Sequence, residues 1–454
     1  MTLAAQLAWL PARVAELSSS CGIPGMAVGV LHDGERFTTV TGVTHSELGY
    51  PVLPRTVFQI GSNTKLLTAT ATMRLVERGS LGLDDPVRRH LPSFQLRDPD
   101  GEHITVRHLL THTSGIDGDV TGPEQFGPDV QERYAAQLSD IGLLHPPGTH
   151  WSYCNAGWAL LGRVLEVVTG QRYSDLLEEL VLRPLGMSRT FVLPEQMLGE
   201  SVAFGHLPSA EGGYAPAPVF ATAPGCAPAG SVPVASIDDV LTFLQAHFDD
   251  GVAADGTQFL QSSTVRAMQQ HQVAIPPIRQ LHGMGLGWLL GTTEEGERVV
   301  GHGGGTLGQI AMLETLPDQQ LAVVILTNSF GGAMAGPELL KELLLDLAGA
   351  TFASGLEPPD EPPSLDLAPY AGTYQRRGTT VRLTAQGNAL VADIEEEPPI
   401  PEAKTAPLQM TLLPLDPERF VIQGSGGVVH FLDLHDTGVP SYLFNFRLLQ
   451  RVTP

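Results

Sequence analysis

The chain has 454 residues, which is more than one hydrophobic core usually spans, so a large catalytic domain and a smaller one are expected. Its hydrophobic fraction of 42% excludes a disordered protein, and its net charge of −23 argues against nucleic acid and anionic membranes as partners. Its three cysteines are too few and too scattered for a disulfide framework or a zinc knuckle, and we expect neither a metal nor another cofactor.

The N-terminal segment predicts an amphipathic helix. Its apolar residues recur at helical spacing: Leu3, Leu7, Leu10, Val14 and Leu17. No basic residues precede this stretch, and no run in the chain approaches the ~18 apolar residues of a membrane span. We therefore expect no signal peptide and a cytoplasmic protein.

Strand patterns occur near both ends of the first 352 residues. Two of them, Met26–Leu31 and Arg36–Thr41, form a predicted hairpin, and helical patterns dominate from about residue 65 to 244. Strand patterns return at Gly287–Gly291, Arg298–Gly301, Gln309–Leu316 and Leu321–Thr327, followed by a predicted helix at Pro337–Ala348. This order predicts an α/β catalytic domain over 1–352, with an antiparallel sheet flanked by helices and a mostly helical lobe inserted at roughly 80–245.

A second domain is predicted at the C-terminal end. Residues 353–366 form a charged, proline-rich linker. Beyond it, 367–454 contains short alternating segments such as Thr380–Leu383, Ala389–Ile394 and Arg419–Ile422, which predict a small all-β barrel or sandwich.

Ser62 and Lys65 are the first candidate catalytic pair. They are separated by three positions in a helical pattern, so one helix face would carry both. A serine hydroxyl needs a base to become a nucleophile, and a buried lysine can serve because burial lowers its pKa. Lys65 is also the only lysine before Lys341 in a chain that otherwise uses arginine. Taken alone, the spacing equally describes a helix-capping serine and an exposed lysine.

Two further motifs carry groups that such a pair would need. Tyr153 and Asn155 could relay a proton and bind a substrate amide, while a glycine-rich strand edge offers bare N–H groups to an oxyanion. That edge consists of His302, Gly303, Gly304 and Gly305. Each motif also has a structural reading, in which the tyrosine packs, the histidine is a surface residue and the glycines form a turn.

These three motifs, in this order, resemble the serine β-lactamase and penicillin-binding-protein superfamily, in particular its class C β-lactamase-like branch. Four other stretches fit that branch: Leu83–Val87, Ile104–Gly115, Arg183–Met187 and Gly285–Trp288. The resemblance covers roughly residues 5–350.

The resemblance implies a role for each motif. Ser62 attacks an acyl carbon, and Lys65 and Tyr153 share the proton transfers. The backbone N–H groups of Ser62 and Gly305 form the oxyanion hole. Asn155, Gly303 and Gly304 contact the substrate, and His302 is the fourth catalytic residue, at a position where many relatives carry lysine.

Other catalytic sites are disfavoured by their motifs. The chain has no Gly-x-Ser-x-Gly elbow, which argues against an α/β-hydrolase. His108 and His112 lack the glutamate of a zinc protease motif and are expected to be structural. Cys154 is expected to pack behind the site, because neighbours in an extended segment point to opposite sides.

Three enzymatic functions compete. A β-lactamase or DD-peptidase is disfavoured, because no export signal is visible and His302 lacks a permanent charge for a β-lactam carboxylate. An esterase or D-amino-acid peptidase fits the motifs.

The third function is acyl transfer to an amine, because the chain resembles the stand-alone penicillin-binding-protein-type thioesterases. Such enzymes combine this catalytic domain with a lipocalin-like β-domain. They take a peptide from a carrier-protein thioester of a nonribosomal peptide synthetase and macrocyclise it. The resemblance implies a D-residue at the acylation point. A non-enzymatic binding protein is disfavoured because Ser62, Lys65 and Tyr153 occur together.

Overall fold

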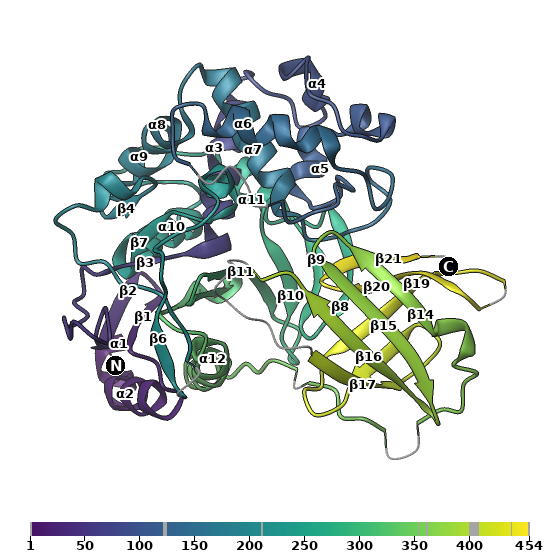
Figure 1. The fold of residues 1–454 in the computed structure, drawn as a ribbon. Coiled ribbons are helices and arrows are strands. Elements are labelled where there is room, and N and C mark those ends of the chain that lie inside the picture. The colour runs from purple at the N-terminus through teal and green to yellow at the C-terminus, as the bar shows by residue number, and fades with distance from the viewer. Residues whose placement is uncertain are drawn as a thin grey trace.

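The computed structural model describes residues 2–120, 125–209, 212–353, 355–359, 362–398, 408–436 and 438–452. Figure 1 shows a large unit with a central sheet and a helical lobe, and beside it a barrel formed by the C-terminal strands. Residues 353–366, the predicted linker, join the two without a helix or strand where they are described; residues 354, 360 and 361 lie outside the described residues.

The central sheet is antiparallel and is built from both ends of the catalytic domain, which confirms the predicted fold class. Its strand order is β2-β1-β13-β12-β11-β10-β9-β8. The bounds are β1 Gly25–His32, β2 Glu35–Gly42, β8 Val273–Ile278, β9 Leu281–Met284, β10 Leu289–Thr292, β11 Arg298–Thr306, β12 Gln309–Leu316 and β13 Leu321–Thr327.

Strand β13 is buried along its whole length, because helices cover both faces of the sheet. Val323 and Ile325 pack in the cluster formed with the terminal helices, whereas Val324 and Leu326 pack toward the helical lobe. This two-sided burial explains why the strand is a continuous apolar run rather than an alternating one.

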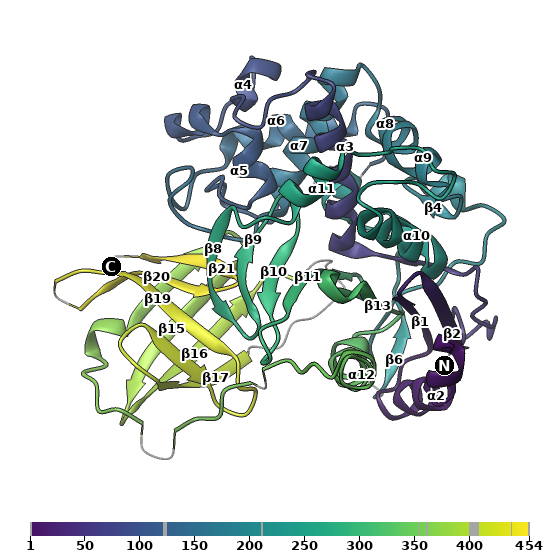
Figure 2. The same cartoon turned by 180° about the vertical axis from the view of Figure 1, so that it is seen from behind.

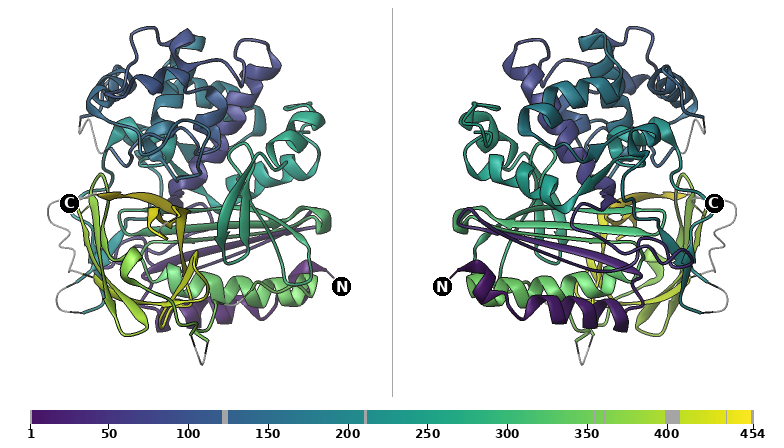
Figure 3. Two further views of the ribbon diagram at one scale, coloured as in Figure 1. Left: turned by 90° about the vertical axis from the view of Figure 1, so that its right-hand side faces the viewer. Right: turned by 90° about the vertical axis from the view of Figure 1, so that its left-hand side faces the viewer.

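The terminal helices α1 Leu3–Gln6, α2 Leu10–Ser20 and α12 Gly332–Ala348 cover one face of this sheet (Figure 3). The single N-terminal helix predicted from spacing is divided in two, and α2 begins with Pro11 in its first turn. A proline there has no N–H for the preceding turn, so it starts a helix rather than continuing one.

The opposite face carries the predicted helical lobe, seen from behind in Figure 2. Its helices are α3 Thr64–Glu77, α4 Val87–His90, α5 Val106–Leu110, α6 Val130–Gln137, α7 Asn155–Thr169, α8 Tyr173–Leu177, α9 Arg183–Leu185, α10 Ile237–Phe248 and α11 Ser262–Met268. Two small sheets complete the domain: β3 Val57–Gln59, β7 Val234–Ser236 and β4 Thr190–Phe191; and β5 His206–Pro208 with β6 Tyr214–Pro216.

The C-terminal domain is a closed eight-stranded antiparallel barrel. Its strands are β14 Gly372–Arg376, β15 Thr379–Gln386, β16 Ala389–Glu396, β17 Leu408–Pro414, β18 Arg419–Ile422, β19 Val428–Leu434, β20 Pro440–Asn445 and β21 Arg447–Val452. Closure between β14 and β21 removes the free edges. Aromatic side chains of Tyr374, Phe420 and Phe431 fill part of the interior.

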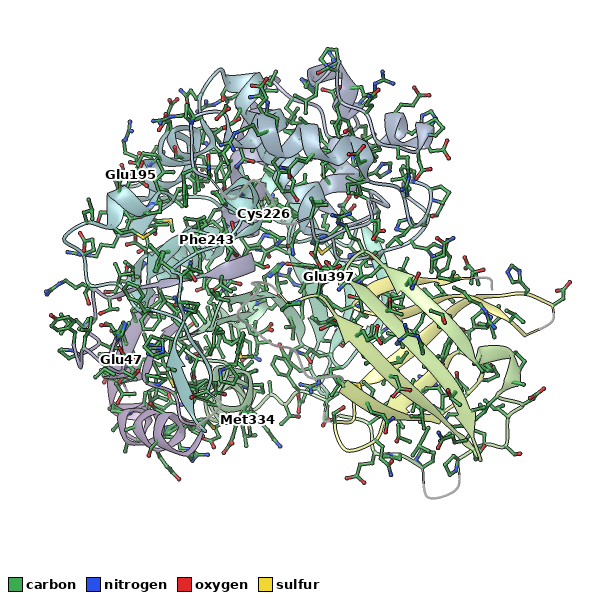
Figure 4. All side chains as sticks on the ribbon, viewed as in Figure 1. Glu47, Glu195, Cys226, Phe243, Met334 and Glu397 are labelled. Atoms are coloured by element: carbon green, nitrogen blue, oxygen red, sulfur yellow. The ribbon has the colours of Figure 1, made fainter. Side chains whose placement is uncertain are left out.

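The barrel packs against the catalytic domain through the β20–β21 hairpin. Phe444 and Leu448 share an apolar cluster with Trp151. The Tyr153 N–H donates to Phe446 O at 3.1 Å. In Figure 4, Glu397, just after β16, lies on the side of the barrel that faces the catalytic domain. The barrel therefore contacts the segment that carries one of the predicted catalytic residues.

Candidate active site

Ser62 lies in a single 3-10 turn, η1 Gly61–Asn63, that leads into α3. The turn differs from the continuous helix suggested by the spacing, but it still brings the pair together: Lys65 Nζ donates to Ser62 Oγ at 3.0 Å. Ser62 is partly exposed, whereas the Lys65 side chain is fully buried. A reachable hydroxyl next to a shielded amine is the arrangement that serine activation requires.

Lys65 has three hydrogen-bond acceptors around its amine. Besides Ser62, they are Asn155 Oδ1 at 2.8 Å and Ala229 O at 2.7 Å. Burial is the main cause that lowers the Lys65 pKa to about 7. Once deprotonated, the amine can keep two N–H groups on Asn155 and Ala229 and direct its lone pair at Ser62. The surroundings thus orient the base as well as lowering its pKa.

Tyr153 stands beside this pair. Its ring lies 4.9 Å from Lys65 Nζ and stacks on the His112 ring at 4.2 Å between centroids, and Ser62 is one of the groups that act on its pKa. Burial raises the Tyr153 pKa, so the phenol is protonated at neutral pH. It can donate a proton to a leaving group once that group leaves the acyl carbon.

Asn155 begins α7, and the preceding Cys154 caps this helix by accepting from the Gly157 N–H at 3.3 Å. The Cys154 thiol is buried against Ile116 O at 3.5 Å, and burial raises its pKa to about 11. A protonated thiol in these surroundings is a poor nucleophile. Asn155 is therefore the member of this segment that reaches Lys65.

His302 lies in β11, and β10 pairs with β11 only as far as Gly301. Burial and the nearby Lys65 lower the His302 pKa to about 3, so the imidazole is neutral. Its Nδ1 lies 2.6 Å from Gly303 O and must carry the proton to bond there. Nε2 is therefore a lone-pair acceptor, buried and without a partner among the described residues.

The glycine segment approaches the nucleophile closely. A Cβ on Gly304 would lie 2.2 Å from Ile60 O and 3.2 Å from Ser62 N, and one on Gly61 would lie 2.7 Å from Gly305 N. The amides of Ser62 and Gly305 are thus held next to each other by contacts that only glycine permits. Two neighbouring N–H groups can stabilise a tetrahedral oxyanion.

Gly304→Ala should lower kcat by roughly 10²-fold, because the added methyl group must push β11 away from η1 and separate the two amides. Stopped-flow hydrolysis of an activated ester measures the change. Gly303→Ala is the matched control, since a Cβ there meets nothing within 4 Å. Equal losses in the two variants would contradict this reading of the glycine segment.

Three charged residues at the site were missed by sequence reasoning. Asp119 Oδ1 accepts from Asn155 Nδ2 at 2.7 Å. Asp119 Oδ2 lies 2.9 Å from Arg447 Nε and 3.3 Å from Arg376 NH1, both of which belong to the barrel. No motif marks these residues, since a lone aspartate and two arginines far apart in sequence carry no spacing signal.

Two features are absent from the described residues. No helix there is long and apolar enough to cross a bilayer. No group of three or more histidine, cysteine, aspartate or glutamate side chains in that part of the chain could hold a metal ion.

Comparison with known proteins gives consistent matches. A family model described as Beta-lactamase matches residues 10–347. Penicillin-binding protein 4 of Amycolatopsis lactamdurans is 38% identical over 360 residues, covering 78% of this chain and 94% of that protein. Esterase EstB of Burkholderia gladioli is 30% identical over 371 residues, covering 73% of this chain and 91% of that protein.

A solved structure extends the likeness to the C-terminal domain. The crystal structure of SurE has a TM-score of 0.80 and 27% identity, and it covers 99% of this chain and 100% of its own. A second SurE structure, described as containing D-Leu, has a TM-score of 0.78 and 28% identity. Unlike the two sequence relatives, SurE matches across the barrel as well.

Proposed function

Because the chain belongs to the β-lactamase and penicillin-binding-protein superfamily, whose members include serine hydrolases, we propose that it is an acyl-enzyme-forming peptidyl thioesterase that macrocyclises a nonribosomal peptide. The observation that carries the acylation step is the contact between Ser62 and Lys65, a buried amine with two other acceptors and a pKa of about 7. No other group among the described residues near the serine is as well placed to take its proton.

Acylation begins when neutral Lys65 takes the proton of Ser62 and Oγ attacks the carbonyl carbon of a peptidyl thioester. The amides of Ser62 and Gly305 bind the oxyanion. When the C–S bond breaks, the thiolate of the carrier receives a proton through Tyr153 or Lys65. The peptide is then an ester on Ser62, and the free thiol leaves.

In the second step the N-terminal amine of the same peptide attacks this ester. The amine loses one proton to the Lys65–Tyr153 pair, Ser62 Oγ regains a proton, and a cyclic amide is released. Neutral His302 can orient an attacking amine, because its Nε2, which has no partner among the described residues, can accept an N–H bond from it. Its low pKa makes it an orienting acceptor rather than a base.

Two observations support a cyclase acting on a D-residue. The likeness to SurE covers nearly the whole of both chains, barrel included. One SurE structure contains D-Leu, which supports a D-configured residue at the acylation point. We propose a carrier protein as the partner that delivers the peptide, and the cytoplasm as the compartment.

The second candidate function is a simple esterase or D-amino-acid amidase. It is favoured by the 30% identity to EstB over most of the catalytic domain. A β-lactamase is less favoured, because neutral His302 offers no cation to a β-lactam carboxylate.

The test offers the enzyme a peptidyl thioester mimic with a D-residue at its C-terminus and reads the products by mass. The proposal predicts a Ser62 adduct followed by a product one water lighter than the linear acid. Linear acid alone, together with fast turnover of simple esters or D-amino-acid amides, would establish the second function. The same peptide with an L-residue is the control.

His302→Lys should lower the ratio of cyclic to linear product about tenfold, the size of one lost hydrogen bond of about 1.4 kcal/mol. An ammonium group cannot accept the bond that Nε2 offers to the attacking amine. His302→Gln retains an acceptor and should stay within a few-fold of the wild type. Equal product ratios in all three proteins would contradict this role.

A further inference from the structure

Asp119 joins the barrel to the catalytic lysine through a continuous chain of polar contacts. Arg447 and Arg376 hold one carboxylate oxygen, and the other accepts from Asn155, whose amide oxygen binds Lys65 Nζ. We infer that Asp119 is a positioning residue through which the barrel fixes Asn155 and Lys65, so that the barrel forms part of the active site.

Asp119 fixes the orientation of the Asn155 amide. An ionised carboxylate only accepts hydrogen bonds, so Asp119 selects the amide NH₂ group at 2.7 Å. The amide oxygen is then the end that faces Lys65, at 2.8 Å. If the amide turned over, its NH₂ group would face the lysine amine and remove one of the three acceptors that orient it.

Two arginines of the barrel hold Asp119 in place. Arg447 Nε lies 2.9 Å from Oδ2, and its guanidinium also lies over the Tyr153 ring at 5.2 Å from the centroid. The Arg376 side chain is only 12% exposed. Asp119 is paired with two arginines, one of them largely buried, so this contact is less screened by solvent than a surface ion pair.

A residue close to Asp119 in sequence also contacts the barrel. Asp117 Oδ1, two residues earlier, accepts from the Arg377 N–H at 2.9 Å. The loop that carries Asp119 is thus held against the β14–β15 turn at two points. Displacement of the barrel would release this loop and Asn155 together.

Asp119 and Arg447 also act on Lys65 through their charges. Asp119 favours the charged form of Lys65 and Arg447 favours the neutral form, each acting on a pKa that burial has already lowered. Among the described residues, the other titratable groups around the amine are the protonated phenol of Tyr153, the neutral imidazoles of His112 and His302, and the thiols of Cys154 and Cys226, whose pKa values are raised. Asp119 and Arg447 are therefore the charged pair that balances the base.

Removing the charge of Asp119 and removing the charge of Arg447 should shift the pKa of Lys65 in opposite directions. Asp119→Asn removes the negative charge and should lower the pKa of Lys65, whereas Arg447→Met removes the positive charge and should raise it, each by roughly half a unit to one unit. Arg447→Lys keeps the charge and should restore a pKa close to the wild-type value. A purely structural contact would not give shifts of opposite sign.

The measurement is a ¹⁵N NMR titration of ¹⁵N-lysine-labelled full-length protein. The chain contains only Lys65, Lys341 and Lys404, so the buried amine can be assigned by its loss in Lys65→Met. Because this titration needs no substrate, it tests the role of Asp119 even if the enzyme forms no macrocycle. The catalytic readout, the pH profile of kcat/KM for a simple ester, rests on the Ser62 acylation step of the proposed function.

Asp433→Asn is the matched control, since Asp433 contacts the catalytic domain at another place, His150 Nε2 at 2.9 Å, and is not among the groups that act on the pKa of Lys65. It should leave the pKa of Lys65 and the ester profile unchanged. Asp119→Asn should in addition slow ester acylation by about tenfold, as Asn155 loses its fixed orientation. The inference is overturned if Asp119→Asn and Arg447→Met give the wild-type pKa or shift it in the same direction.

Discussion

Ser62→Ala is expected to abolish acyl-enzyme formation and to lower ester turnover by at least about 10³-fold. No other nucleophile among the described residues of the site can replace it, because Tyr153 is held protonated and the Cys154 thiol is buried with a raised pKa. Intact-mass spectrometry after incubation with a reactive ester or fluorophosphonate gives the result directly, as the presence or absence of one adduct.

The matched control is Cys154→Ala, which removes the thiol next to Tyr153 and leaves Ser62 in place. We expect this variant to be acylated like the wild type, apart from a modest loss of stability from the helix cap. An adduct that persists in Ser62→Ala and disappears in Cys154→Ala would refute Ser62 as the nucleophile.

Lys65→Arg is expected to lower kcat/KM for acylation by about 10³-fold, within the 10²–10⁴ range of general-base catalysis. In the wild type, the rate should rise tenfold per pH unit below about 7 and level off above it, because only the neutral amine can take the serine proton and its pKa is about 7. Arginine stays protonated at all these pH values, so this acidic limb should disappear along with the rate.

Lys65→Met separates charge from proton transfer, because it removes the base without leaving a cation in the buried site. Circular dichroism and a thermal melt should accompany both variants, since Asn155 and Ala229 lose a shared donor in Lys65→Met. If kcat/KM falls by a similar factor in both variants while their thermal melts match that of the wild type, the loss is due to the missing base. An arginine variant with near-wild-type rates would contradict proton transfer by Lys65.

Much of the architecture could be predicted because its causes are local or periodic. Alternation and turn residues marked the first hairpin, and the run at Leu321–Thr327 marked a strand, which the structure shows to be buried along its whole length. The division of the N-terminal helix was not predicted. The spacing of Leu3 to Leu17 stays helical through the break, and only Pro11 carries the signal that separates α1 from α2.

The catalytic motifs were predictable because their chemistry depends on particular residue types at short spacing. Ser62 and Lys65 are one turn apart, Tyr153 and Asn155 are two positions apart, and the glycines are consecutive. What spacing could not show is protonation. The pKa of Lys65 depends on burial and on distant charges, so a sequence reading could name the base but not the pH at which it works.

The sequence by itself determined the nucleophile candidate, a central sheet with strands from both ends of the catalytic domain, and the existence of a second, all-β domain, because each depends on neighbours along the chain. Only the tertiary structure decided that the two domains share one site. Asp119 meets Arg376 and Arg447 across more than 250 positions, a contact created by barrel closure and domain packing rather than by any local pattern. Charge–charge contacts of this kind leave no periodic trace, and so Ser62 and Lys65 could be predicted while the residues that hold Asn155 against Lys65 could not.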